Sequence, residues 1–149
     1  MRLLIVSLLL LFQSGVGWKI QWCIDGDTVI LYKDTQLLRV RLAYIDAPEA
    51  SQPYGQEAKE ELALLTYGKS LTIKKIDVDK YGRTVALLYS GDECINEEMI
   101  KNGYCWVYKQ YAPDSLYQEY LTARRNKLHL WSTDNPEPPF KWRLKHKNK

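Results

Sequence analysis

Three acidic residues in the first third of the chain, Asp27, Asp46 and Glu49, are of the types that phosphate chemistry requires. Asp46 and Glu49 lie in the run RLAYIDAPE (41–49), where an alternating apolar pattern meets Pro48 and a strand should turn. A carboxylate can bind a hard cation or act as a general base, and these two roles need neighbouring but different positions. Taken alone, this run is typical of an ordinary turn.

The run Asp25-Gly26-Asp27-Thr28 brings two further considerations. Asp and Gly favour a turn or bulge, which is the structural interpretation of this segment. Glycine also lets the backbone come close to an ion, which is the functional one. Because the candidate ligands are all oxygen donors, a cation held here would be calcium or magnesium in preference to zinc or copper.

Two arginines could complete a phosphate site. Arg41 belongs to the strand before Asp46, and Arg83 ends the turn DKYGR (79–83). Phosphoryl chemistry needs positive donors where charge builds on the phosphorus oxygens, and the planar fork of arginine suits that task better than lysine. An ordinary surface charge is the alternative for Arg83.

The three cysteines, Cys23, Cys94 and Cys105, match no zinc-binding spacing. They are interpreted as packing residues or as one disulfide with one thiol left over, and the sequence does not say which two would pair.

Apolar periodicity predicts an α+β fold that is mainly β. Strands are expected over 18–24, 29–32, 38–44, 71–78 and 84–89, with a brief extended stretch at 104–108. Helices are expected over 55–67, from a cap at Asn96 to about Gly103, and from a capping box of Ser115 with Gln118 to about Leu128. Pro136, Pro138 and Pro139 should break regular structure.

A length of 149 residues fits a single domain. Residues 1–17 are predicted to be a signal peptide, because a positive start is followed by a short apolar run and small residues. Residues 18–135 would be the folded domain and 136–149 a basic C-terminal tail. The net charge of +3 falls to +2 without Arg2, so only the clustered tail suggests attraction to polyanions, and a solvated end explains it equally well.

Taken in order, DGDT, RLAYIDAPE, a helix, DKYGR and NEEMIKNGYCWVY resemble the staphylococcal nuclease (thermonuclease) family from Cys23 to Ser132. The resemblance implies a five-stranded OB-fold barrel with three helices. It also implies a calcium ion held by Asp27, Asp46 and the carbonyl of Ala47, with magnesium or manganese less favoured and Asp25 just outside the ligands.

The resemblance assigns the remaining roles as well. Glu49 would activate the attacking water, while Arg41 and Arg83 would stabilise the phosphate. Lys80 and Tyr81 would contact a neighbouring phosphate, and Trp106 and Tyr108 would line the nucleotide site, since aromatic faces stack on any base. The expected protein is a monomer without a membrane anchor after signal cleavage, secreted or periplasmic, that cuts single-stranded or denatured DNA and RNA and leaves 3′-phosphate ends.

Two alternatives come from other classes of protein. One is a nucleic-acid-binding module of the same fold that has lost catalysis, and the other is an unrelated OB-type interaction domain. Neither requires all three acids together with both arginines. The sequence also departs from the family in a short connection at 50–54 and in Trp106, which stands where the family has a tyrosine and so lacks a phenol hydroxyl.

Overall fold

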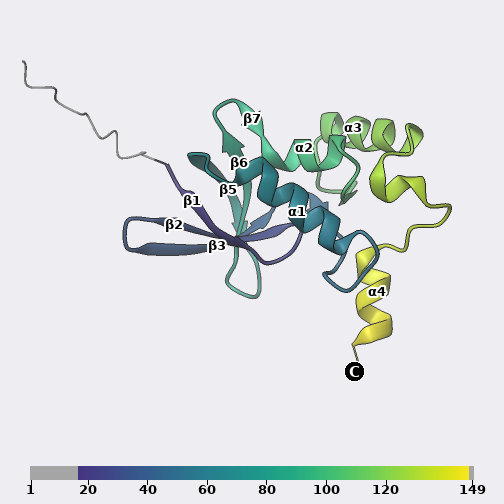
Figure 1. The fold of residues 1–149 in the computed structure, drawn as a ribbon, viewed down its shortest axis with the longest axis horizontal. Helices are drawn as coiled ribbons and strands as arrows, with labels where there is room; N and C mark the ends of the chain where they lie inside the picture. The colour runs from purple at the N-terminus through teal and green to yellow at the C-terminus, as the bar shows by residue number, and fades with distance from the viewer. Residues whose placement is uncertain (1–16, 148–149) are drawn as a thin grey trace, which may run out of the picture.

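In the computed structural model, which describes residues 17–147, a curved sheet is covered by helices on one side (Figure 1). The strands are β1 (Lys19–Cys23), β2 (Thr28–Lys33), β3 (Gln36–Leu42), β4 (Ile45–Asp46), β5 (Leu71–Val78), β6 (Thr84–Ser90), β7 (Glu93–Cys94) and β8 (Trp106–Val107). The helices are α1 (Gly55–Thr66), α2 (Ile95–Lys101), α3 (Asp114–Arg125) and α4 (Pro139–His146), with a 3₁₀ turn at His129–Ser132. The predicted signal peptide, residues 1–17, lies outside the described residues except for Gly17.

The main sheet has the order β1-β2-β3-β6-β5, with β7 paired to β6. All of its pairs are antiparallel except β3 with β6, while β4 and β8 form a separate two-stranded sheet. Irregularities in β1 and β5 bend the sheet, and a single bridge between Trp18 and Leu71 joins its two outer strands. The sheet is therefore strongly curled, but no continuous ladder closes it.

The α+β, mainly β class is confirmed, whereas the expected count of five strands and three helices is wrong for the described residues. The extra strands β4, β7 and β8 have two residues each, which is too short for a period of two to appear in the sequence. The extra helix, α4, begins at Pro139, where a break was expected. Proline lacks only an N–H that the first helical turn leaves unpaired, so it can begin a helix as well as end one.

The core lies between the curled sheet and the helices α1 and α2. The alternation predicted for β2 and β3 is present, because Val29, Leu31 and Val40 are fully buried while Arg39 is exposed. Leu62 of α1 and Met99 of α2 are also fully buried and belong to the same cluster. This packing fixes the loop that enters β2 and the segment that follows β3, which carry the acidic residues.

Both helix caps predicted from the sequence are wrong. Asn96 is the second residue of α2 and is fully buried; its side chain accepts a hydrogen bond from Leu88 N and donates to the carbonyls of Ala43 and Ala86. Ser115 forms no capping bond, because α3 starts at Asp114 directly after Pro113. The Asn96 side chain is used in hydrogen bonds to residues distant in the chain, and Pro113 sets the start of α3.

The cysteines are free thiols: Cys23 and Cys105 are buried and Cys94 is half-buried. Burial raises the pKa of the Cys105 thiol well above its usual value. The packing interpretation therefore describes them, and no disulfide joins them. Separately, none of the helices within residues 17–147 has the length and apolar character that crossing a bilayer requires.

Candidate active site

Asp27 and Asp46 come together in the structure around one guanidinium group. Arg41 Nη2 lies 3.3 Å from Asp27 Oδ2 and 3.3 Å from Asp46 Oδ1. Both acids are buried, with 5% and 4% of their surface exposed. The pairing of β2 with β3 places Thr28 opposite Arg41, and β4 follows two residues after β3, so the fold itself brings these three side chains to one point.

Backbone and hydroxyl donors fix this cluster. The amide of Ala47 donates to Asp27 Oδ2 at 2.7 Å, and Thr28 Oγ1 donates to Asp27 Oδ1 at 3.0 Å. Arg41 Nη1 donates to the carbonyls of Leu42 at 2.9 Å and Ile45 at 2.8 Å. The guanidinium therefore has little freedom to leave the two carboxylates.

Asp25 stands behind the cluster. Its Oδ1 accepts a hydrogen bond at 3.0 Å from the amide of Asp27, which shapes the turn between β1 and β2. Its negative charge adds to that of Asp27, in agreement with a place just outside the central acids.

Burial dominates the electrostatics of the two acids. It raises the pKa of Asp27 to about 6, with Arg41 acting in the opposite direction and Asp25 adding to the rise. Burial also raises the pKa of Asp46, against a hydrogen bond from Arg143. Two carboxylates brought this close in a dry setting favour additional positive charge beside them.

Two glycines allow α1 to pack against the acidic loops. A Cβ on Gly26 would lie 2.7 Å from Ala58 Cβ and 2.8 Å from Ala47 Cβ. A Cβ on Gly55 would meet Glu49 O, the carbonyl oxygen of the turn that carries the third acid. The first turn of α1 therefore packs directly against the loop that carries Glu49.

Glu49 sits at the edge of the cluster, with 35% of its side chain exposed. Gln52 stabilises the turn in two ways. Its backbone N–H donates to the carbonyl oxygen of Glu49 at 2.8 Å, and its side-chain Oε1 accepts from the backbone N–H of Glu49 at 3.1 Å. The Glu49 carboxylate is therefore more open to solvent than those of Asp27 and Asp46.

Arg143 of α4 is a site residue that the sequence reasoning did not identify. Its Nη1 donates to Glu49 Oε1 at 2.7 Å and to Asp46 Oδ1 at 3.2 Å, while its Nη2 donates to Asp46 Oδ2 at 3.2 Å. In the sequence it is one of several evenly spaced cations in the basic tail. No local pattern distinguishes it from its neighbours there.

Two cavities open beside the cluster. One, of about 510 Å³, is lined by residues that include Arg41, Asp79, Arg83 and Tyr108. Arg83 Nε donates to Asp79 Oδ2 at 2.6 Å, so Asp79 fixes the orientation of the Arg83 guanidinium group. Arg41 and Arg83 therefore line the same cavity.

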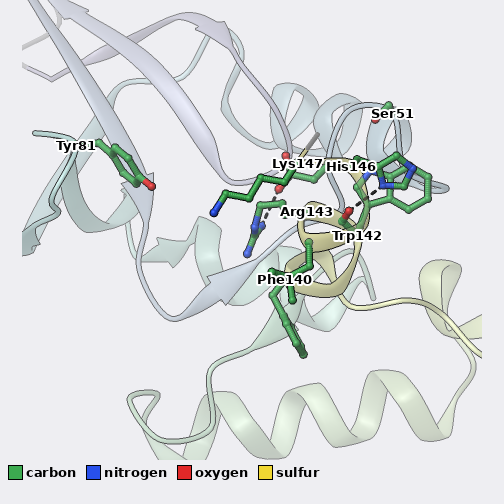
Figure 2. A pocket seen from close by; sticks show the side chains of 9 residues that line it. Ser51, Tyr81, Phe140, Trp142, Arg143, His146 and Lys147 are labelled. Carbon is green, nitrogen blue, oxygen red and sulfur yellow. Dashed lines mark hydrogen bonds and ion pairs between the residues drawn. The ribbon is translucent and has the colours of Figure 1, made fainter. Parts of the chain in front are cut away.

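The other cavity, of about 660 Å³, lies on the Glu49 side (Figure 2). Figure 2 shows the side chain of Lys147, which directly follows α4, extending toward Tyr81 in the turn between β5 and β6. The Arg143 side chain lies beside it, closer to the helix. Glu49 thus stands at the boundary between α4 and the rest of the site.

The predicted substrate contacts fall into two groups. Tyr81 is 72% exposed, with Lys80 Nζ 5.1 Å from its ring centroid, and Tyr108 lines the smaller cavity. Trp106 instead packs its ring edge-on against Trp131, with centroids 5.0 Å apart, and it lines neither of these two cavities.

The donor set at Asp27 and Asp46 suits a hard cation, because two carboxylates converge there. Within residues 17–147 there is no group of three or more His, Cys, Asp or Glu side chains placed to hold a metal. A cation here would thus take backbone oxygens or waters as further ligands.

Residues 39–133 match the family model described as staphylococcal nuclease homologue. The chain is 39% identical to a protein of Haemophilus influenzae named as an uncharacterized endonuclease, over 98% of this chain and 87% of that protein. It is 38% identical to a micrococcal nuclease of Shigella flexneri, over 84% of this chain and 79% of that protein. It is also 38% identical to a probable staphylococcal-like nuclease of rice, Oryza sativa, over 89% of this chain and 35% of the longer plant protein. With its acids and arginines gathered at one site, this chain belongs to the staphylococcal nuclease family.

Proposed function

We propose that this protein is a calcium-dependent nuclease that hydrolyses phosphodiester bonds in DNA and RNA. The observation that carries the proposal is the convergence of Asp27 and Asp46 on Arg41, with Arg83 lining the same cavity as Arg41 and Glu49 at the edge of the acidic cluster. The named relatives are an endonuclease and nucleases, which supports a hydrolase acting on nucleic acids.

In this proposal Asp27, Asp46 and the carbonyl of Ala47 hold the cation. Calcium is preferred because hard oxygen donors in a flexible set suit its coordination, while magnesium and manganese are less favoured. When bound, the cation supplies positive charge next to the phosphate and the attacking water.

Glu49 acts on the water. Its carboxylate is exposed enough to reach solvent and takes a proton as the water oxygen attacks phosphorus. The bond from phosphorus to the 5′ oxygen breaks, and that oxygen takes a proton from solvent, which leaves a 3′-phosphate on one product and a 5′-hydroxyl on the other. Because water attacks phosphorus directly, no covalent intermediate between a side chain and the substrate is needed.

Arg41 and Arg83 act on the phosphate. Both carry donors into the same cavity, and Asp27 and Asp79 respectively keep those donors in place. Fixed positive donors stabilise the charge that builds on the phosphorus oxygens in the transition state. A lysine at either position would lack the planar fork.

The preferred substrate is single-stranded or denatured nucleic acid. Tyr81 and Tyr108 offer aromatic faces beside the two cavities, and stacking on such faces tolerates any base. Lys80 adds a cation next to Tyr81. Trp106 pairs with Asp46 through β8 and β4 and packs against Trp131, and its predicted place at the nucleotide site stays part of this proposal.

We further propose that the protein acts as a monomer after export, in the periplasm or the medium. The support for export is the sequence pattern of residues 1–17, and the monomer is carried over from the expectation that the family resemblance raises.

The first test is digestion of denatured DNA by the purified protein with calcium, with and without a chelator. Cleavage that requires calcium and yields 3′-phosphate ends is expected. A folded preparation that binds single strands but leaves them intact with calcium, magnesium and manganese would instead identify a binding module.

A further inference from the structure

The C-terminal helix α4 reaches the acidic cluster through one side chain. Arg143 contacts both carboxylate oxygens of Asp46 and one of Glu49, at 2.7 to 3.2 Å. This arginine is 94 residues from Glu49 in the chain and lies beyond residues 39–133, the part that matches the family model. The contact therefore lies outside the range of the family model, within the longer stretch that matches the Haemophilus influenzae protein.

The contact uses the atoms that a cation would need. Both oxygens of Asp46 accept from Arg143, and Oδ1 also accepts from Arg41. The carboxylate oxygens of Asp27 accept hydrogen bonds from Thr28 and Ala47 and form an ion pair with Arg41. Asp46 could join a cation only if it gave up part of its pairing, and Arg143 is the partner that can most easily leave.

Arg143 is more weakly anchored than Arg41. Its side chain is 44% exposed, against 13% for Arg41, and it makes no hydrogen bond to a backbone carbonyl among the described residues. In α4 only Pro139 is buried, while Phe140 and Leu144 are 51% and 68% exposed. Figure 1 shows α4 at the end of a long connection, apart from α2 and α3.

The local charges point in the same direction. Asp27, Asp46 and Glu49 carry three negative charges, which the two positive charges of Arg41 and Arg143 nearly balance. A divalent cation placed beside Arg143 would meet a like charge. Without Arg143 the same acids would present a stronger field to that cation.

We propose that Arg143 is a further residue of the active site, one that sets the affinity for the divalent cation by pairing with the carboxylates that serve it. This inference rests on the proposed function, because it assumes that Asp46 is a cation ligand. Arg143 and the cation compete for Asp46, so α4 is held at the site when the cation is absent and is released when it binds.

The test is calcium binding by titration calorimetry to the full-length protein and to Arg143→Ala. Loss of this competing positive charge should strengthen calcium binding on the order of tenfold, because calcium no longer has to displace an ion pair from Asp46. Lys141→Ala is the matched control, because Lys141 is an exposed cation on the same helix without an ion pair among the described residues. It should bind calcium within about twofold of the natural protein, since its charge is distant and screened.

A second readout follows α4 itself through amide hydrogen exchange with calcium or with chelator. Calcium should speed exchange in residues 139–146 of the natural protein, whereas in Arg143→Ala exchange there should already be fast and unaffected by calcium. Calcium binding that is no tighter in Arg143→Ala, or exchange in α4 that calcium slows or leaves unchanged, overturns the inference.

The two hypotheses fail differently. If the natural protein binds calcium and cuts DNA while Arg143→Ala shows no tighter binding, only the role of Arg143 is wrong. If neither protein binds calcium and chelator leaves cleavage intact, the proposed cation is wrong and the role of Arg143 is wrong with it.

Discussion

Arg41 has two functions that are hard to separate by mutation. It lines the cavity in which we propose that the phosphate binds, and it also neutralises the buried pair Asp27 and Asp46. Burial disfavours its charge, but these two acids outweigh burial and raise the pKa of Arg41. Its removal would leave two buried carboxylates without this partner and threaten folding, so Glu49 is the cleaner residue for a test of chemistry.

Replacing Glu49 by Gln should lower turnover by about 10²-fold or more, since an amide cannot take a proton from water. The turn should persist, because Gln52 holds it through the backbone of Glu49 and not through the carboxylate. Initial rates on denatured DNA at saturating calcium give the measurement. Glu60→Gln, on the exposed face of α1, is a control that should keep its rate. Rates within a few fold of the natural protein would remove Glu49 from the chemistry.

At the scale of the element, α2 is tied to the sheet by one polar side chain. Asn96 is fully buried and links the helix to the backbone of Leu88, Ala43 and Ala86. Asn96→Ala should lower the free energy of unfolding by about 2–4 kcal/mol, because a buried N–H and two carbonyls lose their partner. Urea unfolding measures this, with exposed Asn126→Ala as the control. A loss below about 1 kcal/mol would mean that water replaces the amide.

The turn between β5 and β6 should give a pH-dependent contribution to stability. Burial acts to raise the pKa of Asp79, but hydrogen bonds from the backbone and side chain of Arg83 and from the amide of Tyr81 outweigh it and lower that pKa. A carboxyl with a depressed folded pKa stabilises the fold above its unfolded pKa, and this contribution disappears as the pH falls through the folded value.

Asp79→Asn should therefore reduce the free energy of unfolding most between pH 5 and pH 7, and the difference from the natural protein should shrink below about pH 4. Urea unfolding across this range measures it, and Asp134→Asn, in an exposed loop, is the control. A difference that stays constant with pH would show that the Asp79 charge contributes nothing.

Strands and helices with a clear apolar period could be predicted from the sequence, and others could not. β2, β3 and α1 follow from alternation or helical spacing because each packs one face on the core. The cap at Asn96 was wrong because a local pattern cannot show that a strand 53 residues away in the chain, near Ala43, offers a carbonyl. The start of α4 at Pro139 depends on proline being accepted in a first turn.

At the scale of the whole molecule, α4 is peripheral to folding. Only Pro139 of this helix is buried, and the core cluster contains no residue beyond Trp131. Removal of residues 140–149 should keep cooperative unfolding and shift the midpoint temperature by less than about 4 °C, the effect of about 1 kcal/mol in a domain of this size. Circular dichroism melting in chelator measures this. Loss of a cooperative transition would place α4 within the folding unit.

The candidate site shows the same division between local and distant information. Asp27, Asp46 and Glu49 were proposed together because their motifs occur in family order, and the fold places them around Arg41 and Arg143. Arg143 could not be found in this way, since its partners are more than 90 residues away and its tail has many equivalent cations. Only the packing of α4 selects it.

The close approach of Gly26 and Gly55 to the acidic loops sets a limit on how this sequence can vary. Neither residue has a side chain that could touch substrate, yet a methyl group at either position would collide with Ala47 and Ala58 or with the carbonyl of Glu49. In a random mutant library, both positions should be as intolerant as the acids themselves. Inactive clones there would still contain every side chain of the site, but with the turn that carries Glu49 displaced from Arg41 and Arg143.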